Sequence, residues 1–279
     1  MKSFLVVDGH NLLFRMFYGI PGSIKTSKGT EVKAVVGFIS GLFKYLNKFS
    51  PDHMMVVFDS ETSIIDKSND YEDYKSNRIN YADVPESENP FIQLPYIFQA
   101  LSYLGIPYKE IKEHEADDYI ASFCEKYRNK YKAIIVSTDQ DFFQLADDNI
   151  SVFNPNGGEG TMYTPSKIYE KLGVYPDQIV EYKSLIGDKS DNISGIRGVG
   201  PKTAQRILSY GSIKEIMGKG CTDEKFCDIL RENEAIINRN MKLISMKRDI
   251  PVTFETNKSI KEIDTYARVM DIIKSSGIS

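Results

Sequence analysis

Cysteine and histidine are scarce in this chain of 279 residues, which contains three of each. The cysteines, Cys124, Cys221 and Cys227, form no CxxC pair and suggest no disulfide framework. So few cysteines are typical of a reducing compartment, and we therefore predict a cytoplasmic location.

Long apolar runs are also missing from the sequence. No run approaches the roughly 20 residues that span a bilayer, so a membrane protein is not expected. Asp8, His10, Asn11 and Arg15 interrupt the apolar stretches near the N-terminus, which argues against a signal peptide. The hydrophobic content of 41% is ordinary for a globular protein and suffices for one large domain or two small ones.

Charge is distributed unevenly along the chain. The net charge is −4, but residues 183–248 contain 13 Lys and Arg against 8 Asp and Glu, a local net charge of +5. The remainder carries −9, so a basic segment accompanies an acidic one. This pattern fits a phosphate-binding region beside a metal site, although chance unevenness would produce it too.

Three short apolar runs are each followed by an aspartate. Continuous apolar runs separated by helical patterns are typical of buried parallel strands, so we predict an α/β protein. Sites in such proteins form at the carboxyl ends of the strands, where the three aspartates should meet. The predicted strands cover residues 3–7, 54–58 and 133–138, the aspartates are Asp8, Asp59 and Asp139, and the predicted helices cover residues 32–49, 91–104 and 119–127.

Six further carboxylates accompany these aspartates, namely Glu115, Asp117, Asp118, Asp141, Asp188 and Asp191. A single Asp after a strand is most often a turn residue or a helix cap, but that explanation weakens for nine carboxylates that one fold brings together. Crowded carboxylates repel one another unless cations separate them. Oxygen ligands without Cys or His favour Mg²⁺ or Mn²⁺ over Zn²⁺, and two such ions could activate water and stabilise the leaving oxygen of a phosphodiester.

Residues 187–204 read GDKSDNISGIRGVGPKTA and combine acids with a glycine-rich turn. The three-residue spacing of Asp188 and Asp191 predicts that they share one face of a helix. Gly198, Gly200 and Pro201 predict a tight turn that leads into a helix over residues 202–209. Backbone N–H groups at such a helix start can bind a phosphate, so metal ions would have to separate the acids from a nucleic acid.

A long polar insertion covers residues 60–90. Loops of this length are usually functional or disordered. The insertion holds only Lys67, Lys75 and Arg78 against eight acids, so a strongly basic tunnel is not expected. We expect that the insertion could become ordered only when substrate binds.

Six motifs in one order closely resemble the bacterial and phage 5′-nuclease (flap endonuclease) family, which includes the N-terminal 5′-nuclease domain of DNA polymerase I. The motifs are VDGHNLLFR (7–15), VFD (57–59), YKSNR (74–78), HEADD (114–118), STDQD (137–141) and GDKSDNISGIRGVGPKTA (187–204). The resemblance spans about residues 3–255. It implies a PIN-like, mostly parallel central sheet flanked by helices, with a helical arch insertion and a C-terminal helix-hairpin-helix region.

The resemblance also implies three regions and two metal sites. The regions are a catalytic core over 1–176 with the arch at about 60–90, a duplex-binding helix-hairpin-helix region over 177–248, and a return to the core with a tail over 249–279. The first site would use Asp8, Asp59, Glu115 and Asp117, and the second Asp118, Asp139, Asp141, Asp188 and Asp191. Each would hold Mg²⁺ or Mn²⁺.

Basic and hairpin residues would complete the site that the resemblance implies. Lys75, Arg78 and Arg15 would stabilise charge at the scissile phosphate, and Tyr74 would stack on a terminal base. For the three cations, the alternative is an ordinary solvated surface charge. The hairpin, often with K⁺, would grip duplex phosphates through Gly195, Arg197, Gly198, Gly200, Lys202 and Thr203.

The expected function is that of a structure-specific, metal-dependent 5′-3′ exonuclease and flap endonuclease. Its substrates would be 5′ flaps, nicked or 5′-ended duplexes and RNA primer–DNA hybrids in replication and repair, and the protein would act as a monomer. Two alternatives stay open: a PIN-like ribonuclease and a non-catalytic, structure-specific DNA-binding protein. The hairpin argues against the first, and nine retained acids near DNA argue against the second.

Overall fold

The computed structural model of the chain describes residues 1–60, 74–76, 79, 81–218 and 223–254. The chain forms two compact units, the first from Met1–Ile64, Asn80–Asp139 and Arg248–Ser279, and the second from Ile65–Ile79 and Gln140–Lys247. Most of the predicted arch, Arg78 included, and the tail from residue 255 lie outside the described residues. In the described part of the chain, no helix is long and apolar enough to cross a membrane.

The first unit contains four parallel strands in the order β3-β2-β1-β4. These are β1 (Lys2–Asp8), β2 (His53–Asp59), β3 (Tyr108–Ile111) and β4 (Tyr131–Val136). The central strands β1 and β2 are almost entirely buried, as expected for apolar runs covered on both faces. The prediction of an α/β fold with a mostly parallel sheet is therefore confirmed.

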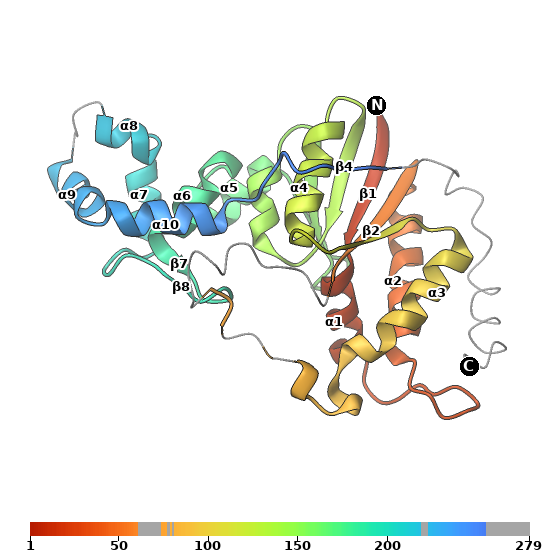
Figure 1. Ribbon diagram of the computed structural model, residues 1–279. Helices are drawn as coiled ribbons and strands as arrows, with labels where there is room; N and C mark the ends of the chain where they lie inside the picture. Colours follow the sequence, from red (N-terminus) through yellow and green to blue (C-terminus); the bar gives the residue numbers. More distant parts are fainter. Residues whose placement is uncertain (61–73, 77–78, 80, 219–222, 255–279) are drawn as a thin grey trace. The chain divides into compact units, whose positions relative to one another are not determined.

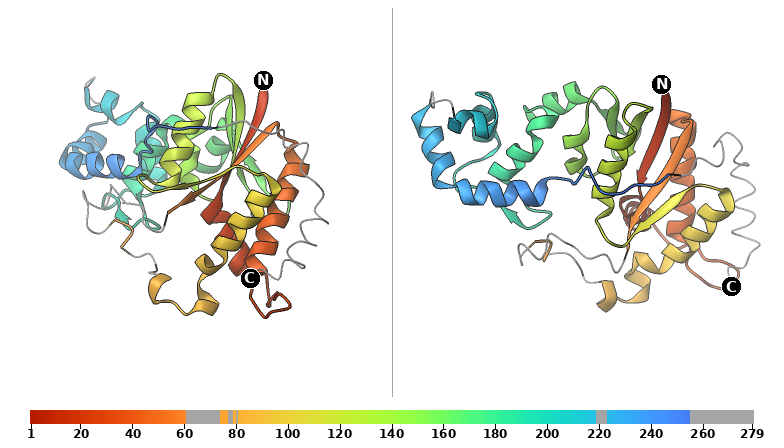
Figure 2. Two further views of the ribbon diagram at one scale, coloured as in Figure 1. Left: turned by 45° about the vertical axis from the view of Figure 1, so that its right-hand side comes forward. Right: turned by 45° about the horizontal axis from the view of Figure 1, so that its top comes forward.

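Helices cover both faces of this sheet (Figures 1 and 2). They are α1 (Gly9–Gly19), α2 (Lys33–Phe49), α3 (Leu94–Leu104) and α4 (Ala116–Tyr127), with short 3-10 turns η2 (Tyr81–Asp83), η3 (Glu86–Glu88) and η4 (Pro90–Gln93). Successive side chains of a strand point to opposite faces of the sheet, so the register of β1 and β2 places Phe4 and Phe58 on opposite faces. The Phe58 ring centroid lies 5.9 Å from Phe38 of α2 and 5.0 Å from Phe98 of α3, whereas Phe4 lies 4.7 Å from Phe123 of α4. Helices α2 and α3 thus cover one face and α4 the other.

Residues 250–254 run along α4 in the first unit. The Tyr119 hydroxyl donates to the carbonyl of Thr253 at 2.8 Å, and the Lys126 ammonium group donates to the carbonyl of Val252 at 2.7 Å. Two side chains one and three turns into α4 therefore fix the end of the described chain to the first unit.

The second unit consists mainly of short helices with two antiparallel strand pairs, β5–β6 and β7–β8 (Figure 1). Its elements are η5 (Gln140–Leu145), β5 (Ile150–Asn154), β6 (Thr161–Tyr163), α5 (Pro165–Leu172), η6 (Pro176–Gln178), α6 (Ile179–Ile186), β7 (Gly187–Asp188), β8 (Ile193–Ser194), α7 (Pro201–Leu208), α8 (Ile213–Gly218), α9 (Glu224–Glu232) and α10 (Glu234–Ile244).

The strands β7 and β8 approach each other so closely that two glycines are required. Gly187 has a φ of 82°, and a Cβ there would lie 2.4 Å from the backbone nitrogen of Gly195. A Cβ on Gly195 would lie 2.2 Å from the carbonyl carbon of Ile186. This hairpin carries Asp188 in β7 and Asp191 in the turn that follows. The prediction that these two acids share a helical face is therefore wrong.

The cysteines differ from one another in the folded chain. Cys227 in α9 is disulfide-bonded, whereas Cys124 in α4 is free and buried. The disulfide at Cys227 departs from the expectation that the cysteine spacing suggests no disulfide framework.

Candidate active site

Asp8 ends β1, and both of its carboxylate oxygens accept hydrogen bonds. Oδ1 accepts from the backbone N–H of Asn11 at 3.0 Å, which caps α1, and Oδ2 accepts from Ser137 Oγ at 2.8 Å. Burial of this side chain, which is 9% exposed, raises the pKa of Asp8 to about 6. The hydrogen bonds offset only part of that effect, and the charges of Asp59 and Asp139 add to it. Asp8 therefore interacts electrostatically with both of the other strand-end aspartates.

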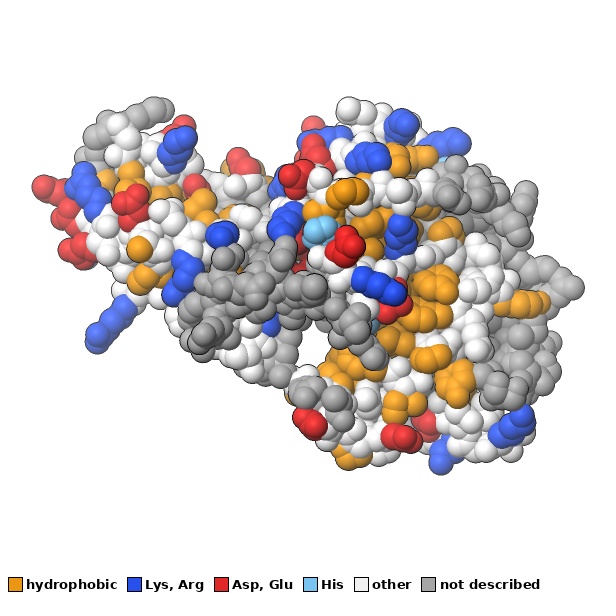
Figure 3. Space-filling model, viewed as in Figure 1, with side chains coloured by type: hydrophobic (Ala, Val, Ile, Leu, Met, Phe, Trp, Pro, Cys, Tyr) orange, Lys and Arg blue, Asp and Glu red, His pale blue; other side chains and the backbone are white. Residues whose placement is uncertain are grey.

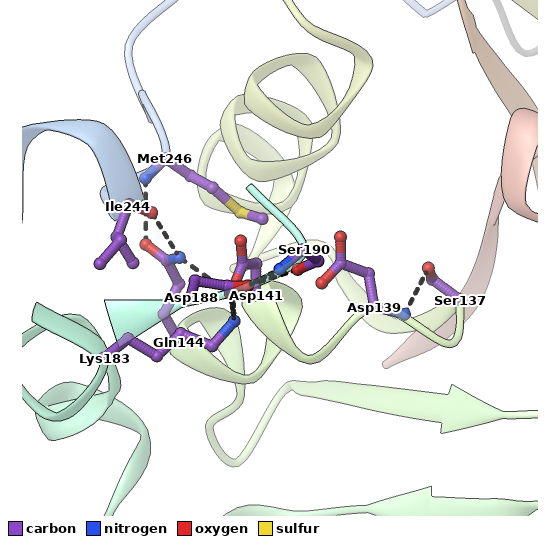
Figure 4. A network of polar contacts seen from close by, with 9 residues as sticks. All are labelled: Ser137, Asp139, Asp141, Gln144, Lys183, Asp188, Ser190, Ile244 and Met246. Atoms are coloured by element: carbon purple, nitrogen blue, oxygen red, sulfur yellow. Dashed lines mark hydrogen bonds and ion pairs between the residues drawn. The ribbon is translucent and has the colours of Figure 1, made fainter. Parts of the chain in front are cut away.

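The turn that carries Asp139 is fixed to α1 by an amide side chain. Asn11 Nδ2 donates to Thr138 Oγ1 at 2.6 Å, and Asn11 Oδ1 accepts from the Thr138 backbone N–H at 3.1 Å. Ser137 Oγ accepts from the backbone N–H of Asp139 at 3.1 Å (Figure 4). Sequence reasoning missed these three positioning residues, although all lie inside the VDGHN and STDQD motifs.

Asp59 links the end of β2 to the start of α4. Its Oδ1 accepts from the backbone N–H of Ala116 at 2.7 Å, which satisfies one of the N–H groups that a helix start leaves unpaired. Its Oδ2 lies 3.3 Å from His10 Nδ1. Among the described residues, the other ring nitrogen of His10 is buried without a hydrogen-bond partner. His10 is a further positioning residue that sequence reasoning missed.

The HEADD motif forms the start of α4. Glu115 precedes the first helical residue and is 8% exposed, Asp118 is 2% exposed, and Asp117 between them is half-buried. Six of the nine predicted carboxylates thus belong to the first unit, at strand ends or at this helix start. Within the described ranges, no three His, Cys, Asp or Glu side chains are already arranged as a metal-binding group.

The remaining three carboxylates belong to the second unit, where Lys183 bridges two of them. Its ammonium group contacts Asp141 Oδ1 and lies 2.7 Å from Asp188 Oδ2 (Figure 4). Burial alone would raise the pKa of Asp188, but the Lys183 charge and hydrogen bonds from Lys183 and Ser190 hold it below its usual value. Burial would lower the pKa of Lys183, but the two carboxylates raise it.

Gln144 fixes the backbone next to Asp141. Its Nε2 donates to the carbonyls of Asp141 at 3.0 Å and Ile244 at 3.1 Å, and its Oε1 accepts from the backbone N–H of Met246 at 3.0 Å (Figure 4). Gln144 is 5% exposed, so these bonds are shielded from water. They join η5 to the end of α10.

Residues 74–76 pack against the turn that carries Asp191. The backbone N–H of Lys75, whose φ is 57°, donates to the Asp191 carbonyl at 3.0 Å. Lys75 is 9% exposed, and its ammonium group lies 4.8 Å from the centre of the Tyr74 ring. That ring is buried against Ile193 and Leu243, so stacking on a base would require it to leave this cluster.

The predicted phosphate-binding hairpin follows β8. Gly198 has a φ of 83°, and α7 begins at Pro201 as the sequence indicates. Ile196 and Val199 are buried and anchor the hairpin. The exposed members of the predicted set are Arg197, Gly198, Gly200 and Lys202, whereas Gly195 and Thr203 are half-buried.

Acidic side chains gather on α9 of the second unit, which contributes Glu224, Asp228 and Glu232, although Arg231 of the same helix lies 3.3 Å from Asp228. On the face shown in Figure 3, basic side chains also lie over the region of β7 and β8. Arg15 in the first unit instead donates to the hydroxyl of Tyr45 at 3.0 Å, which gives this cation a partner on α2.

Two family models match consecutive parts of the chain. The N-terminal resolvase-like domain of 5′-3′ exonucleases matches residues 3–173, and their C-terminal SAM fold matches residues 174–266. A 5′-3′ exonuclease of Aquifex aeolicus is 36% identical over 269 residues, which are 95% of this chain and 89% of that protein. The thermostable DNA polymerase I of Thermus aquaticus is 38% identical over 215 residues, 76% of this chain but only 24% of the polymerase.

Solved structures share the fold. The T5 D15 protein co-crystallised with metal ions has a TM-score of 0.72 at 25% identity, covering 88% of this chain and 90% of its own. Human GEN1 in complex with Holliday junction DNA has a TM-score of 0.58 at 15% identity, covering 98% of this chain and 68% of its own, which is a likeness of fold alone. The matches of sequence and fold agree, and the chain therefore belongs to the 5′-3′ exonuclease family and is a nuclease.

Proposed function

We propose that this nuclease hydrolyses phosphodiesters of 5′ flaps and of nicked or 5′-ended duplex DNA in a reaction that requires divalent metal ions. The carboxylates at the ends of β1, β2 and β4 carry the proposal, because the buried Asp8 lies close enough to Asp59 and Asp139 to interact with both charges. Structures of the T5 relative contain metal ions, and one of them contains zinc.

The donor chemistry fits Mg²⁺ or Mn²⁺, because every proposed ligand is a carboxylate. Asp8, Asp59, Glu115 and Asp117 would hold one ion, and Asp118, Asp139, Asp141, Asp188 and Asp191 the other. When bound, the two ions would activate a water molecule and stabilise the leaving oxygen. The products would carry a 5′-phosphate and a 3′-hydroxyl.

The hairpin after β8 supports recognition of duplex DNA. It exposes backbone at Gly198 and Gly200 beside the cations Arg197 and Lys202, which suits contact with phosphates and reads the shape of the duplex without reading its bases. A K⁺ ion held by this hairpin would strengthen the same contact. Lys75, Arg78 and Arg15 would add charge stabilisation at the scissile phosphate.

The biological role that we propose is the removal of RNA primers or 5′ flaps during replication and repair, by a monomeric protein in the cytoplasm. The family membership and the basic segment over residues 183–248 support this role. A PIN-like ribonuclease is the competing assignment, and substrate choice distinguishes the two.

Cleavage of a 5′-flap DNA, a nicked duplex, a blunt duplex and an unstructured RNA under Mg²⁺, Mn²⁺ or excess chelator tests the proposal. We expect cleavage of the flap and the nicked duplex with metal and no cleavage with chelator. Asp139→Asn and Asp191→Asn should each lower the cleavage rate at least about 100-fold while flap binding persists, because each removes one ligand charge without changing side-chain size.

Asp148→Asn is the matched control, because it makes the same substitution at an exposed carboxylate near η5. Its cleavage rate should equal that of the wild type. Full activity in chelator, or preferential cleavage of the unstructured RNA, would refute the assignment.

A further inference from the structure

Lys183 occupies the space between two carboxylates that the proposed function assigns to a metal ion. Its ammonium group lies 2.7 Å from Asp188 Oδ2 and also contacts Asp141 Oδ1 (Figure 4). The side chains of Lys183 and Asp141 are each 15% exposed and that of Asp188 is 11% exposed. Water therefore screens these charges far less than it screens a surface ion pair.

The local fold builds this arrangement from three fixed elements. Lys183 lies in the last turn of α6, and Gly187, with φ 82° and ψ 173°, reverses the chain so that Asp188 returns beside it. Asp141 comes from η5, where Gln144 holds its backbone carbonyl at 3.0 Å. Ser190 donates its backbone N–H to the other oxygen of Asp188 at 2.8 Å, which fixes the rotamer of that carboxylate.

We infer that Lys183 is a built-in competitor of the divalent ion at Asp141 and Asp188, and that its ammonium group holds both carboxylates in position until an ion replaces it. The inference rests on the proposed function, because it takes these carboxylates to be metal ligands. An ammonium group and a divalent ion need the same carboxylate lone pairs, and the metal must come closer to them than a hydrogen-bond donor does.

Two consequences follow for metal binding by this chain. Occupation of the position between Asp141 and Asp188 requires displacement of Lys183, so the two divalent ions should bind with clearly different affinities. Removal of Lys183 should increase the affinity of the weaker of the two metal sites. It should also destabilise the metal-free protein, because two largely buried carboxylates would lose their shared counter-ion.

Titration of the full chain with Mn²⁺ alone, followed by the electron paramagnetic resonance signal of free Mn²⁺, tests the inference. We expect Lys183→Met to lower the half-saturating Mn²⁺ concentration of the weaker site at least about tenfold, since a competing unit charge in contact with the ligands is removed. Lys183→Arg, which keeps a cation, should restore weak binding. Lys183→Gln provides a second neutral variant if Lys183→Met does not fold.

Lys189→Met is the control, because it removes an equal charge from an exposed lysine next to Asp188 in the sequence. It should change the weaker site by less than about threefold. Equal effects of the Lys183 and Lys189 substitutions would overturn the inference and leave only a general charge effect. If the wild type binds Mn²⁺ and cleaves flaps but Lys183→Met shows the same Mn²⁺ titration as the wild type, the inference is wrong and the proposed function stands. Wild-type protein that neither binds Mn²⁺ nor cleaves DNA removes the proposed function and the inference together.

Discussion

At the scale of single residues, the candidate site contains polar groups that do not favour folding in the absence of metal. Asp8 is the strongest case, because burial opposes its ionisation while the charges of Asp59 and Asp139 oppose it further. A group whose folded pKa is raised contributes stability below its unfolded pKa and loses it as the pH rises through the folded pKa. For Asp8 this loss falls between pH 3.8 and about 6.

Asp8→Asn should therefore stabilise the metal-free protein at neutral pH. The shift of the Asp8 pKa from 3.8 to about 6 corresponds to about 3 kcal/mol at pH values above both. The amide loses some hydrogen bonding to Ser137 and Asn11, so we expect a net gain of about 1–2 kcal/mol at pH 7.5. Urea unfolding in chelator between pH 4 and 8 measures it.

The pH dependence distinguishes this electrostatic origin from better packing. The advantage of Asp8→Asn should disappear near pH 4, where wild-type Asp8 is protonated in the folded chain. Asp148→Asn at an exposed position should show no advantage at any pH. An Asp8→Asn variant that is equally stabilised at pH 4 and pH 8 would contradict the explanation.

At the scale of elements, the periodic segments could be predicted from the sequence and the short ones could not. The apolar runs of β1 and β2 and the pattern of α2 extend within two residues of their predicted bounds. The strand β3 was missed because it has only four residues, of which only Ile111 is buried, and they carry no alternating or continuous apolar signal. The β7–β8 hairpin was missed because its shape depends on a close backbone approach at Gly187 and Gly195.

The candidate site likewise contains residues that the sequence indicates and residues that it does not. Six of its nine acids follow strands or start a helix, as the sequence pattern indicates, whereas the hairpin that carries Asp188 and Asp191 was not expected. The groups that hold the acids could not be predicted, since Ser137 and Gln144 act through contacts between residues distant in sequence. Lys183 carries no signal of its role, because the sequence does not show that Gly187 turns Asp188 back toward it.

Asn240 is expected to join three elements of the second unit. It lies in α10 with no exposed surface, and its amide nitrogen donates to the carbonyls of Ser184 in α6 at 3.0 Å and of Ser194 in β8 at 2.9 Å. Asn240→Ala leaves both carbonyls without this donor and should lower the free energy of unfolding by about 2–4 kcal/mol. Thermal or urea unfolding measures the loss.

Asn238→Ala provides the comparison for this substitution, because Asn238 is exposed on the same helix. It should change the free energy of unfolding by less than about 0.5 kcal/mol. Since β8 forms one side of the hairpin that carries Asp188, Asn240→Ala should also weaken Mn²⁺ binding. Equal stability of the two alanine variants would show that α10 is held by its apolar contacts alone.

At the scale of the whole molecule, an acidic chain can bind DNA only if its positive charge is concentrated. The net charge is −4, yet residues 183–248 carry +5. The exposed Arg197 and Lys202 lie on the predicted phosphate-binding hairpin that follows β8. Contact with phosphates releases counter-ions, so affinity falls with salt by a slope of about 0.9 per phosphate neutralised. The salt dependence of binding therefore reports whether these cations touch the duplex.

The double variant Arg197→Gln/Lys202→Gln should bind flap DNA at least about tenfold more weakly at 0.1 M salt, with the slope of log affinity against log salt reduced by about 2. The loss should be the same for unrelated duplex sequences, because phosphates and not bases are contacted. Fluorescence anisotropy with labelled flap DNA in Ca²⁺ measures both the affinity and its salt dependence.

The control is the double variant Lys25→Gln/Lys28→Gln, which removes the same charge from exposed positions of the first unit and should leave the slope unchanged. If both double variants reduce the slope equally, the chain attracts DNA through its overall charge, and the hairpin has no special role in gripping the duplex.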